Sequence, residues 1–262
     1  DSAGIAVSHD KSLHVLKCVG APSEHLGADN LHPSSKSLEV SIGIGHNRWA
    51  THGKPTLLNA HPHTDTASRV AVVHNGSILN YETLRKELES GGVVFVSETD
   101  TEVIPHLIAY YLSEGLEMEE AFTLAISRLE GAFGIVAFDT QDDTTLYVAK
   151  EGSPIVIGVT EDSYYVASST HGFLPFTDRF ITLLDGEFAV LSLTRKEGLT
   201  ITSIKEKARV TDRIYQTLEV SNVEDLSKGD FETFMLKEIY EQPVTTLATI
   251  IGRTNEAEGV AV

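Results

Sequence analysis

Cysteine and long apolar runs are nearly absent from this 262-residue chain. Its single cysteine, Cys18, cannot form an internal disulfide. A disulfide-stabilised scaffold is therefore excluded, and a lone thiol fits a reducing compartment, most simply the cytoplasm. No apolar stretch approaches the roughly 20 residues that a membrane-spanning helix needs, so the sequence predicts no membrane contact.

Basic residues are also scarce. Lysine and arginine total 20 against 38 aspartates and glutamates, for a formal net charge of −18. This balance repels phosphate backbones and anionic lipid surfaces, so nucleic acids are not expected partners. The charges are spread along the chain rather than gathered in a tail. With 41% apolar residues, the chain is long enough to bury a substantial core.

Short strand-like segments and helical segments occur in groups along the chain. Strands are predicted at 4–8, 12–18, 41–47, 70–75, 132–138, 145–149, 154–158, 164–169, 180–184, 188–193 and 199–204. Helices are predicted at 81–92, 99–115, 119–131 and 231–243, the last continuing through 244–251. Because strands follow strands rather than alternating with helices, the pattern favours an α+β fold with two stacked antiparallel sheets covered by helices. Thr99 and Glu102 have the spacing of a helix capping box.

Three motifs combine residue types that suit the recognition of an amino acid. They are "GIGHNRWATHGKP" at 43–55, "HNGS" at 74–77 and "SETDTE" at 97–102. The planar guanidinium of Arg48 suits a carboxylate, and Asp100 supplies a fixed negative charge for an ammonium group. The Asn75–Gly76 pair offers an amide and an unhindered backbone N–H, which are the donors of an oxyanion hole.

Each motif also has a purely structural interpretation. Asn75–Gly76 is a common hairpin-turn dipeptide, and Asp100 could complement a helix dipole. Arg48 could form a structural salt bridge, and the only tryptophan, Trp49, could belong to the core.

Several histidines lie close together in the sequence, which raises the alternative of a metal site. They are His46, His52, His61, His63 and His74. No HExxH or paired-cysteine spacing accompanies them, so structural or substrate-contacting roles are favoured over a metal site. For Cys18, the pattern favours a buried structural thiol over a nucleophile.

Taken in order, eight segments resemble one family. They are "DSAGIAV", "GHNRWATHGKP", "NAHPH", "VVHNG", "FVSETDTEVI", "LEGAFGIVAFD", "GSPIVIG" and "FMLKEIYEQP". This combination resembles the N-terminal glutaminase domain of the glutamine–fructose-6-phosphate aminotransferases (isomerizing), or glucosamine-6-phosphate synthases, within the class II glutamine amidotransferases. "RWATHG" and "HNG" occur across that class, whereas "KEIYEQP" is typical of the synthases.

The resemblance implies a four-layer αββα sandwich of the N-terminal-nucleophile hydrolase type. The glutaminase half of the family releases ammonia from glutamine without a metal or organic cofactor. A sugar-isomerase half uses that ammonia to convert fructose 6-phosphate to glucosamine 6-phosphate in amino-sugar biosynthesis, and it is expected to form a homo-oligomer.

The resemblance also implies roles for individual residues. Arg48 would bind the glutamine α-carboxylate and Asp100 its α-amino group, while Asn75 and Gly76 would form the oxyanion hole. The residues that would line, order or gate the pocket are Trp49, Thr51, His52 and His61.

One departure from the family concerns the nucleophile, an N-terminal cysteine whose own α-amino group is the base. That cysteine opens a strand that precedes the "DSAG" segment, and Cys18 does not match its position. The chain as given is therefore expected to lack the first strand, the following helix and glutamine hydrolysis. We expect an N-terminally incomplete glutaminase domain at 1–243 and the start of a linker at 244–262.

Two other functions remain open at this point. The chain could be a glutamine-binding pseudo-glutaminase that regulates a partner. It could also belong to another class II amidotransferase, such as an amidophosphoribosyltransferase.

Overall fold

The computed structural model describes residues 1–20, 22, 41–49, 53–217 and 228–250, together with the backbone of 254–255 and 260–261. The chain divides into two compact units, Asp1–Thr217 and Leu218–Val262. The first unit carries the three motifs at 43–55, 74–77 and 97–102, and the second contains one helix, which includes the "FMLKEIYEQP" segment.

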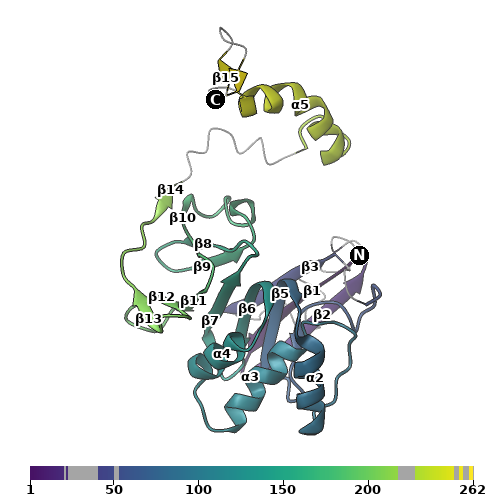
Figure 1. Ribbon diagram of the computed structural model, residues 1–262, viewed down its shortest axis with the longest axis vertical. Coiled ribbons are helices and arrows are strands. Elements are labelled where there is room, and N and C mark those ends of the chain that lie inside the picture. The colour runs from purple at the N-terminus through teal and green to yellow at the C-terminus, as the bar shows by residue number, and fades with distance from the viewer. Residues whose placement is uncertain are drawn as a thin grey trace. The chain divides into compact units, whose positions relative to one another are not determined.

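A seven-stranded antiparallel sheet forms the centre of the first unit (Figure 1). Its strands, in spatial order, are β13 (Ala208–Val210), β12 (Leu199–Ser203), β11 (Glu187–Ser192), β7 (Asp142–Glu151), β6 (Gly131–Asp139), β5 (Val70–Ile78) and β4 (His63–Thr64). The middle strands are apolar on both sides, because both faces of this sheet are covered.

Three helices cover one face of the central sheet (Figure 1). They are α2 (Tyr81–Ser90), α3 (Val103–Ser113) and α4 (Met118–Ser127). Leu107 and Phe122 of these helices pack in one core cluster with Val72 and Ile135 of the sheet. Burying such large apolar side chains stabilises the fold by roughly 1.5–3 kcal/mol each.

Two smaller antiparallel sheets cover the opposite face. One contains β2 (Ser12–Val19), β1 (Ser2–His9) and β3 (Ile42–Arg48), and the other contains β14 (Gln216–Thr217), β10 (Arg179–Thr182), β8 (Val156–Val159) and β9 (Tyr164–Ala167). Ile44 packs against Phe138 of the central sheet, and Ile157 packs against Val148. The stacked sheets and their helices confirm the α+β sandwich. The described residues contain one of the two helical layers of an αββα arrangement.

The predicted capping box is wrong. Helix α3 begins at Val103, and Glu102 precedes it without a side-chain capping bond. The Glu102 carboxylate instead accepts hydrogen bonds from the backbone N–H groups of Val96 and Ser97, at 2.8 and 2.7 Å. Thr99 bonds to the side chain of His63 at 3.1 Å. Both residues therefore hold the loop before the helix rather than the helix itself.

The second unit contains α5 (Phe234–Ile250), followed by the short strands β15 (Thr254–Asn255) and β16 (Val260–Ala261). The predicted continuation of this helix beyond residue 243 is confirmed, and Pro243 lies inside it. A domain end at residue 243 remains a prediction, as does the assignment of 244–262 to a linker.

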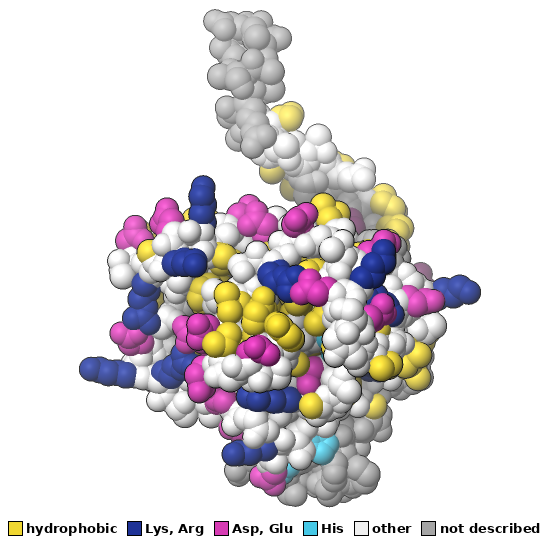
Figure 2. Space-filling view, turned by 60° about the horizontal axis from the view of Figure 1, so that its bottom comes forward, with side chains coloured by type: hydrophobic (Ala, Val, Ile, Leu, Met, Phe, Trp, Pro, Cys, Tyr) yellow, Lys and Arg dark blue, Asp and Glu magenta, His cyan; other side chains and the backbone are white. Residues whose placement is uncertain are grey.

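Charged side chains of both signs are interspersed over the face shown in Figure 2, around a central group of hydrophobic side chains. This distribution agrees with the spread of charge along the sequence. Within the described ranges, no helix is long and apolar enough to cross a membrane.

Candidate active site

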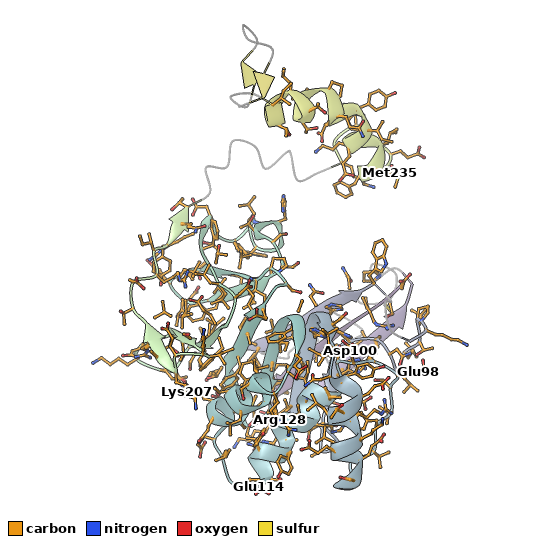
Figure 3. All side chains as sticks on the ribbon, viewed as in Figure 1. Glu98, Asp100, Glu114, Arg128, Lys207 and Met235 are labelled. Atoms are coloured by element: carbon orange, nitrogen blue, oxygen red, sulfur yellow. The ribbon has the colours of Figure 1, made fainter. Side chains whose placement is uncertain are left out.

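One cavity of about 440 Å³ is lined by six of the eight residues predicted for the site. These six are Arg48, Trp49, His61, Asn75, Gly76 and Asp100. They come from the end of β3, the segment before β4, the end of β5 and the loop before α3. Figure 3 shows Asp100 and Glu98 on the side of the first unit that carries β1 to β3. The other two predicted residues, Thr51 and His52, lie outside the described residues.

The Asn75–Gly76 pair lies inside a strand and not in a hairpin turn. Strand β5 continues through both residues to Ile78, and Gly76 pairs with Phe133 of β6. Gly76 has φ +130°, and a Cβ placed there would collide with the backbone carbonyl oxygen of Ala132. Only glycine fits this backbone conformation and this close approach. The pair is exposed although the preceding five residues of β5 are buried.

Asp100 is fixed by the same strand. Its Oδ2 accepts a hydrogen bond from the backbone N–H of Ile78 at 2.8 Å, and the residue is buried. Because it lies three residues before the first residue of α3, its local role is not that of a helix cap. This bond places a carboxylate beside the exposed end of β5, where Asn75 and Gly76 line the same cavity.

Arg48 ends β3 and is buried. Its guanidinium donates to the backbone carbonyls of Lys54 and Gly53, at 3.3 and 3.4 Å. Burial lowers the pKa of Arg48, and the charges of Asp100 and Glu98 oppose that shift. Because an arginine remains charged at any physiological pH, the cavity holds a permanent cation together with the carboxylate of Asp100.

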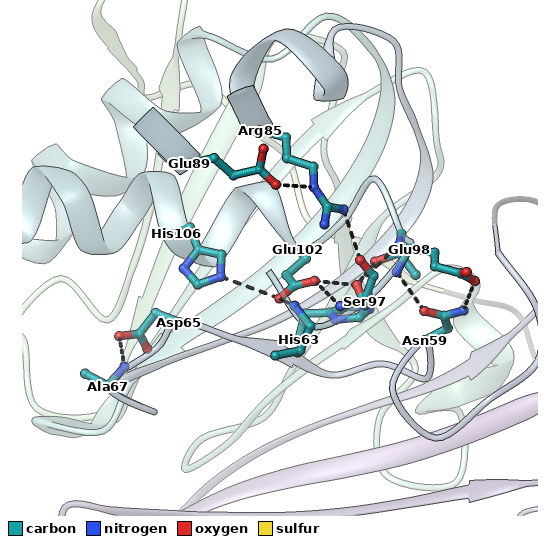
Figure 4. Close-up of polar contacts among 12 residues, drawn as sticks. Asn59, His63, Asp65, Ala67, Arg85, Glu89, Ser97, Glu98, Glu102 and His106 are labelled. Atoms are coloured by element: carbon teal, nitrogen blue, oxygen red, sulfur yellow. Dashed lines mark hydrogen bonds and ion pairs between the residues drawn. The ribbon is translucent and has the colours of Figure 1, made fainter. Parts of the chain in front are cut away.

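Asn59 and Glu98 hold the segment that follows Arg48 (Figure 4). The Asn59 side-chain amide donates to the carbonyl of Lys54 at 2.9 Å and to the Glu98 carboxylate at 3.0 Å. The Glu98 backbone N–H donates back to the Asn59 side-chain carbonyl at 2.9 Å. Sequence reasoning missed this pair, although Asn59 belongs to the quoted "NAHPH" segment and Glu98 to "SETDTE".

Four histidines form a ring cluster, and three of them, His46, His61 and His74, line the cavity. His61 stacks on His46 at 4.3 Å between ring centroids and meets the edge of His63 at 4.9 Å. His74 lies parallel to His61 at 6.5 Å, and the Thr101 hydroxyl bridges the two rings at 2.9 and 3.3 Å.

The rings of His46, His61 and His63 are neutral at neutral pH, because the pKa of each is lowered. Burial lowers the pKa of His61 well below its usual value and that of His63 to about 3, with further lowering from neighbouring positive charges. Among the described residues, no three histidine, cysteine or acidic side chains are arranged to hold a metal ion. His61 lines the cavity, so its ring forms part of the wall.

Glu102 anchors the loop that carries Asp100 (Figure 4). Burial by itself raises the pKa of a carboxyl group. The nearby ring of His106, whose Nε2 lies 3.6 Å from the carboxylate, and hydrogen bonds from Ser97 and Val96 outweigh this effect and lower the pKa of Glu102 to about 2. The carboxylate is therefore ionised at neutral pH, and both its oxygens accept hydrogen bonds.

A groove runs from the cavity between two unpaired sheet edges. Strand β3 pairs only with β1, and β9 pairs only with β8, among the described strands. Adjoining cavities of about 430, 210 and 220 Å³ lie between these two edges. Val136 and Leu146 of the central sheet form their floor. The groove is thus bordered by backbone groups of two strands and reaches Asn75 at one end.

Two structural interpretations of single residues can now be decided. Trp49 is 85% exposed at the rim of the cavity, so its placement in the core is wrong. Cys18 is a buried free thiol, which confirms the structural interpretation over the nucleophilic one.

The chain is similar to glutamine-using enzymes in both sequence and fold. Residues 46–175 match the model of the glutamine amidotransferase domain. The glutamine–fructose-6-phosphate aminotransferase (isomerizing) of Pyrococcus horikoshii is 41% identical over 264 residues, which is 100% of this chain and 42% of the relative. That of Bacillus cereus is also 41% identical, over 99% of this chain and 41% of the relative.

Among solved structures, a glutamine phosphoribosylpyrophosphate amidotransferase from B. subtilis, complexed with ADP and GMP, matches with a TM-score of 0.63. The two sequences are 26% identical, and the match covers 78% of this chain and 43% of the solved chain. The chain spans about two fifths of the length of the curated relatives it matches. The higher identity to the fructose-6-phosphate aminotransferases favours that branch over the phosphoribosyl branch.

Proposed function

The chain belongs to the glutamine amidotransferase domain family through residues 46–175, and from this we propose that its cavity binds glutamine for hydrolysis to glutamate and ammonia. The observation that carries the proposal is the composition of that cavity. A buried cation, Arg48, and a buried carboxylate, Asp100, line the same space as the exposed Asn75–Gly76 pair. This set matches a zwitterionic amino acid that ends in a carboxamide.

Each group takes one part of the substrate. The guanidinium of Arg48 pairs with the α-carboxylate, and the carboxylate of Asp100 pairs with the α-ammonium. The side-chain N–H groups of Asn75 and the backbone N–H of Gly76 stabilise the oxyanion that forms at the substrate amide. A cavity of about 440 Å³ has the size of a small-molecule site.

The nucleophile of the proposed reaction is the thiol of an N-terminal cysteine on an extended segment. The groove between β3 and β9 fits such a segment, because both edges offer unpaired backbone groups within the described strands. Its cysteine would lie at the Asn75 end. The thiol gives its proton to the cysteine's α-amino group, attacks the amide carbon, and ammonia leaves with that proton. Water then hydrolyses the thioester to glutamate.

For the whole protein we infer the activity named for its relatives. Ammonia released here would be used by a further region to convert fructose 6-phosphate to glucosamine 6-phosphate, in the cytoplasm and in a homo-oligomer. We infer that Trp49 gates the exit of ammonia, and its 85% exposure among the residues that line the cavity supports this role. Roles for Thr51 and His52 in glutamine binding stay predictions of the family resemblance.

Glutamine binding can be tested by isothermal titration calorimetry on the chain itself. We expect L-glutamine to bind and Arg48→Ala to weaken binding at least tenfold, because the α-carboxylate loses its partner. Arg195→Ala removes an equally charged but exposed side chain that pairs with Glu119, and it serves as the matched control. Equal binding by the two variants, or no binding by the unaltered chain, would contradict the proposal. Binding without hydrolysis even when the nucleophile is supplied would support the regulatory alternative.

A further inference from the structure

One close contact of the site belongs to a residue with no role so far. The Nε2 atom of His46, on β3, lies 2.7 Å from the Oδ1 atom of Asn75, on β5. The two residues are 29 positions apart in the sequence and belong to different sheets. Both line the glutamine cavity.

The chemistry of the two atoms fixes the proton. Oδ1 of an asparagine carries no hydrogen and can only accept, so Nε2 of His46 must be the donor. The other ring nitrogen, Nδ1, is buried and has no hydrogen-bond partner among the described residues. Burial lowers the pKa of His46, the hydrogen bond to Asn75 opposes that shift, and the nearby charge of Arg48 adds to it. Because the net shift is downward, the ring is neutral at neutral pH, and the bond to Asn75 assigns its single hydrogen to Nε2.

This donor decides which way the Asn75 amide faces. With Oδ1 held by His46, the amide nitrogen and its two hydrogens point away from the ring. Asn75 is exposed to the cavity, so those hydrogens are available to a ligand. A flipped amide would present an acceptor to the developing oxyanion and would repel it.

The His46 ring is itself held in place. It stacks on His61 at 4.3 Å with an interplanar angle of 26°. His61 is buried and meets His63 on another side. The ring therefore has a rigid support on one face and the Asn75 bond at its edge.

We propose that His46 is a positioning residue that turns the amide donors of Asn75 into the cavity, toward the carbonyl oxygen of the substrate amide. This inference rests on the proposed function, because the oxyanion role belongs to Asn75. His46 does not act as an acid or base. One of its nitrogens is engaged by Asn75 and the other is buried.

The first test compares two ligands by calorimetry. L-Glutamine has the amide carbonyl that Asn75 would contact, whereas L-norvaline has the same α-groups and a chain of similar length without an amide. We expect His46→Phe to weaken glutamine binding about tenfold, the value of one hydrogen bond, and to change norvaline binding less than about twofold. His46→Gln, which can place an N–H near the Nε2 position, should restore glutamine binding.

The control variant is His171→Gln, at an exposed histidine of the η3 turn (Thr170–Gly172). It should bind both ligands as the unaltered chain does. Equal losses for both ligands in His46→Phe would show a general structural defect and would overturn the positioning role. Unchanged glutamine binding in that variant would overturn it as well.

A second test does not depend on glutamine. The ring ¹⁵N chemical shifts of His46 should show the neutral tautomer protonated at Nε2, and the side-chain NH₂ signals of Asn75 should shift in His46→Phe but return in His46→Gln. A ring protonated at Nδ1 would overturn the inference even if glutamine binds. If the unaltered chain binds neither ligand while His46 shows the Nε2 tautomer, the proposed function fails and the His46–Asn75 contact stands.

Discussion

The carboxylate of Asp100 is bonded to the backbone of Ile78, with 2.8 Å between Oδ2 and the amide nitrogen. Ile78 ends β5, two residues after Gly76. The bond therefore couples the position of the negative charge to the strand that carries Asn75 and Gly76. In the proposed function, a substrate held at its ammonium group by Asp100 would lie at a set distance from these two residues. The proposed α-ammonium and oxyanion sites would then be parts of one rigid arrangement.

Asp100→Asn is predicted to separate charge from structure at this position. Asparagine keeps an oxygen that can accept the Ile78 N–H, but it loses the charge that pairs with an ammonium group. We expect glutamine affinity to fall at least tenfold, because a charge-assisted bond contributes about 1.5–3 kcal/mol. Thermal stability should change little.

The control for this prediction is a ligand without the ammonium group. Glutaramate, which is glutamine lacking its α-amino group, should bind Asp100→Asn no more weakly than it binds the unaltered chain. Calorimetry with both ligands measures the difference. If both ligands lose affinity equally, Asp100 acts through the shape of the site rather than through its charge.

Gly76→Ala is predicted to destabilise the first unit strongly. A Cβ at this position collides with the carbonyl oxygen of Ala132, and φ +130° is unfavourable for alanine. Gly92→Ala is the matched control, because Gly92 has φ +92° but no atom within 4 Å of an added Cβ. We expect the free energy of unfolding to fall by about 1 kcal/mol for Gly92→Ala and by at least about 3 kcal/mol for Gly76→Ala.

Urea unfolding followed by circular dichroism measures both values. Equal losses would show that β5 shifts away from β6 at low cost. In that case the close approach of Gly76 to Ala132 would not constrain the site.

The buried, neutral ring of His63 predicts a fall in stability at acid pH. Burial lowers the pKa of His63 to about 3 in the folded state, from a usual value of 6.5. Between pH 6.5 and 3 the unfolded chain therefore binds a proton that the folded chain excludes. The free energy of unfolding should decrease by about 1.4 kcal/mol per pH unit from this residue as pH falls through that window, and the contribution is complete above pH 6.5.

His63→Gln should remove this contribution. The slope of unfolding free energy against pH, measured with urea between pH 6.0 and 4.8, should be smaller in the variant by about 1.4 kcal/mol per pH unit. This range lies above 4.5, the usual pKa of a glutamate. The pKa of Glu102 is about 2 in the folded state, so below pH 4.5 this residue also lowers the free energy of unfolding as pH falls. Measurements at pH 8 set the baseline difference between the two proteins. Parallel slopes would contradict the assignment of a neutral, buried His63.

The motifs and most of the elements could be predicted from the sequence because they depend on local chemistry. Apolar periodicity placed α2 and α4 within a few residues of their observed bounds. The residue types of Arg48 and Asp100 indicated their chemistry, and one cavity contains both.

Long-range relations were not accessible in the same way. The capping-box pattern of Thr99 and Glu102 failed because Thr99 bonds to the distant His63, while Glu102 bonds to the backbone of its own loop. The conformation of Gly76 depends on Ala132 across the sheet, and the partner of His46 lies on another strand. A single sequence carries no periodic signal for such pairs.

A peptide supplied in trans is predicted to give the chain glutaminase activity. It would begin with cysteine and glycine, followed by an alternating apolar strand, and it would pair in the groove between β3 and β9, where both edges lack a further strand among the described residues. We expect glutamate to be released from L-glutamine only when chain and peptide are mixed. An N-acetylated peptide should be inactive because its α-amino group cannot accept the thiol proton, and a serine in place of the cysteine should be far less active.

Val166→Lys, on the β9 edge, should raise the peptide concentration needed for half-maximal activity without changing glutamine affinity. The reason is that Val166 lines the groove but not the cavity that holds Arg48 and Asp100. Binding of the acetylated peptide with the same affinity would show that the groove is occupied while the chemistry is blocked. No binding of any peptide would reject the groove as the seat of the nucleophile.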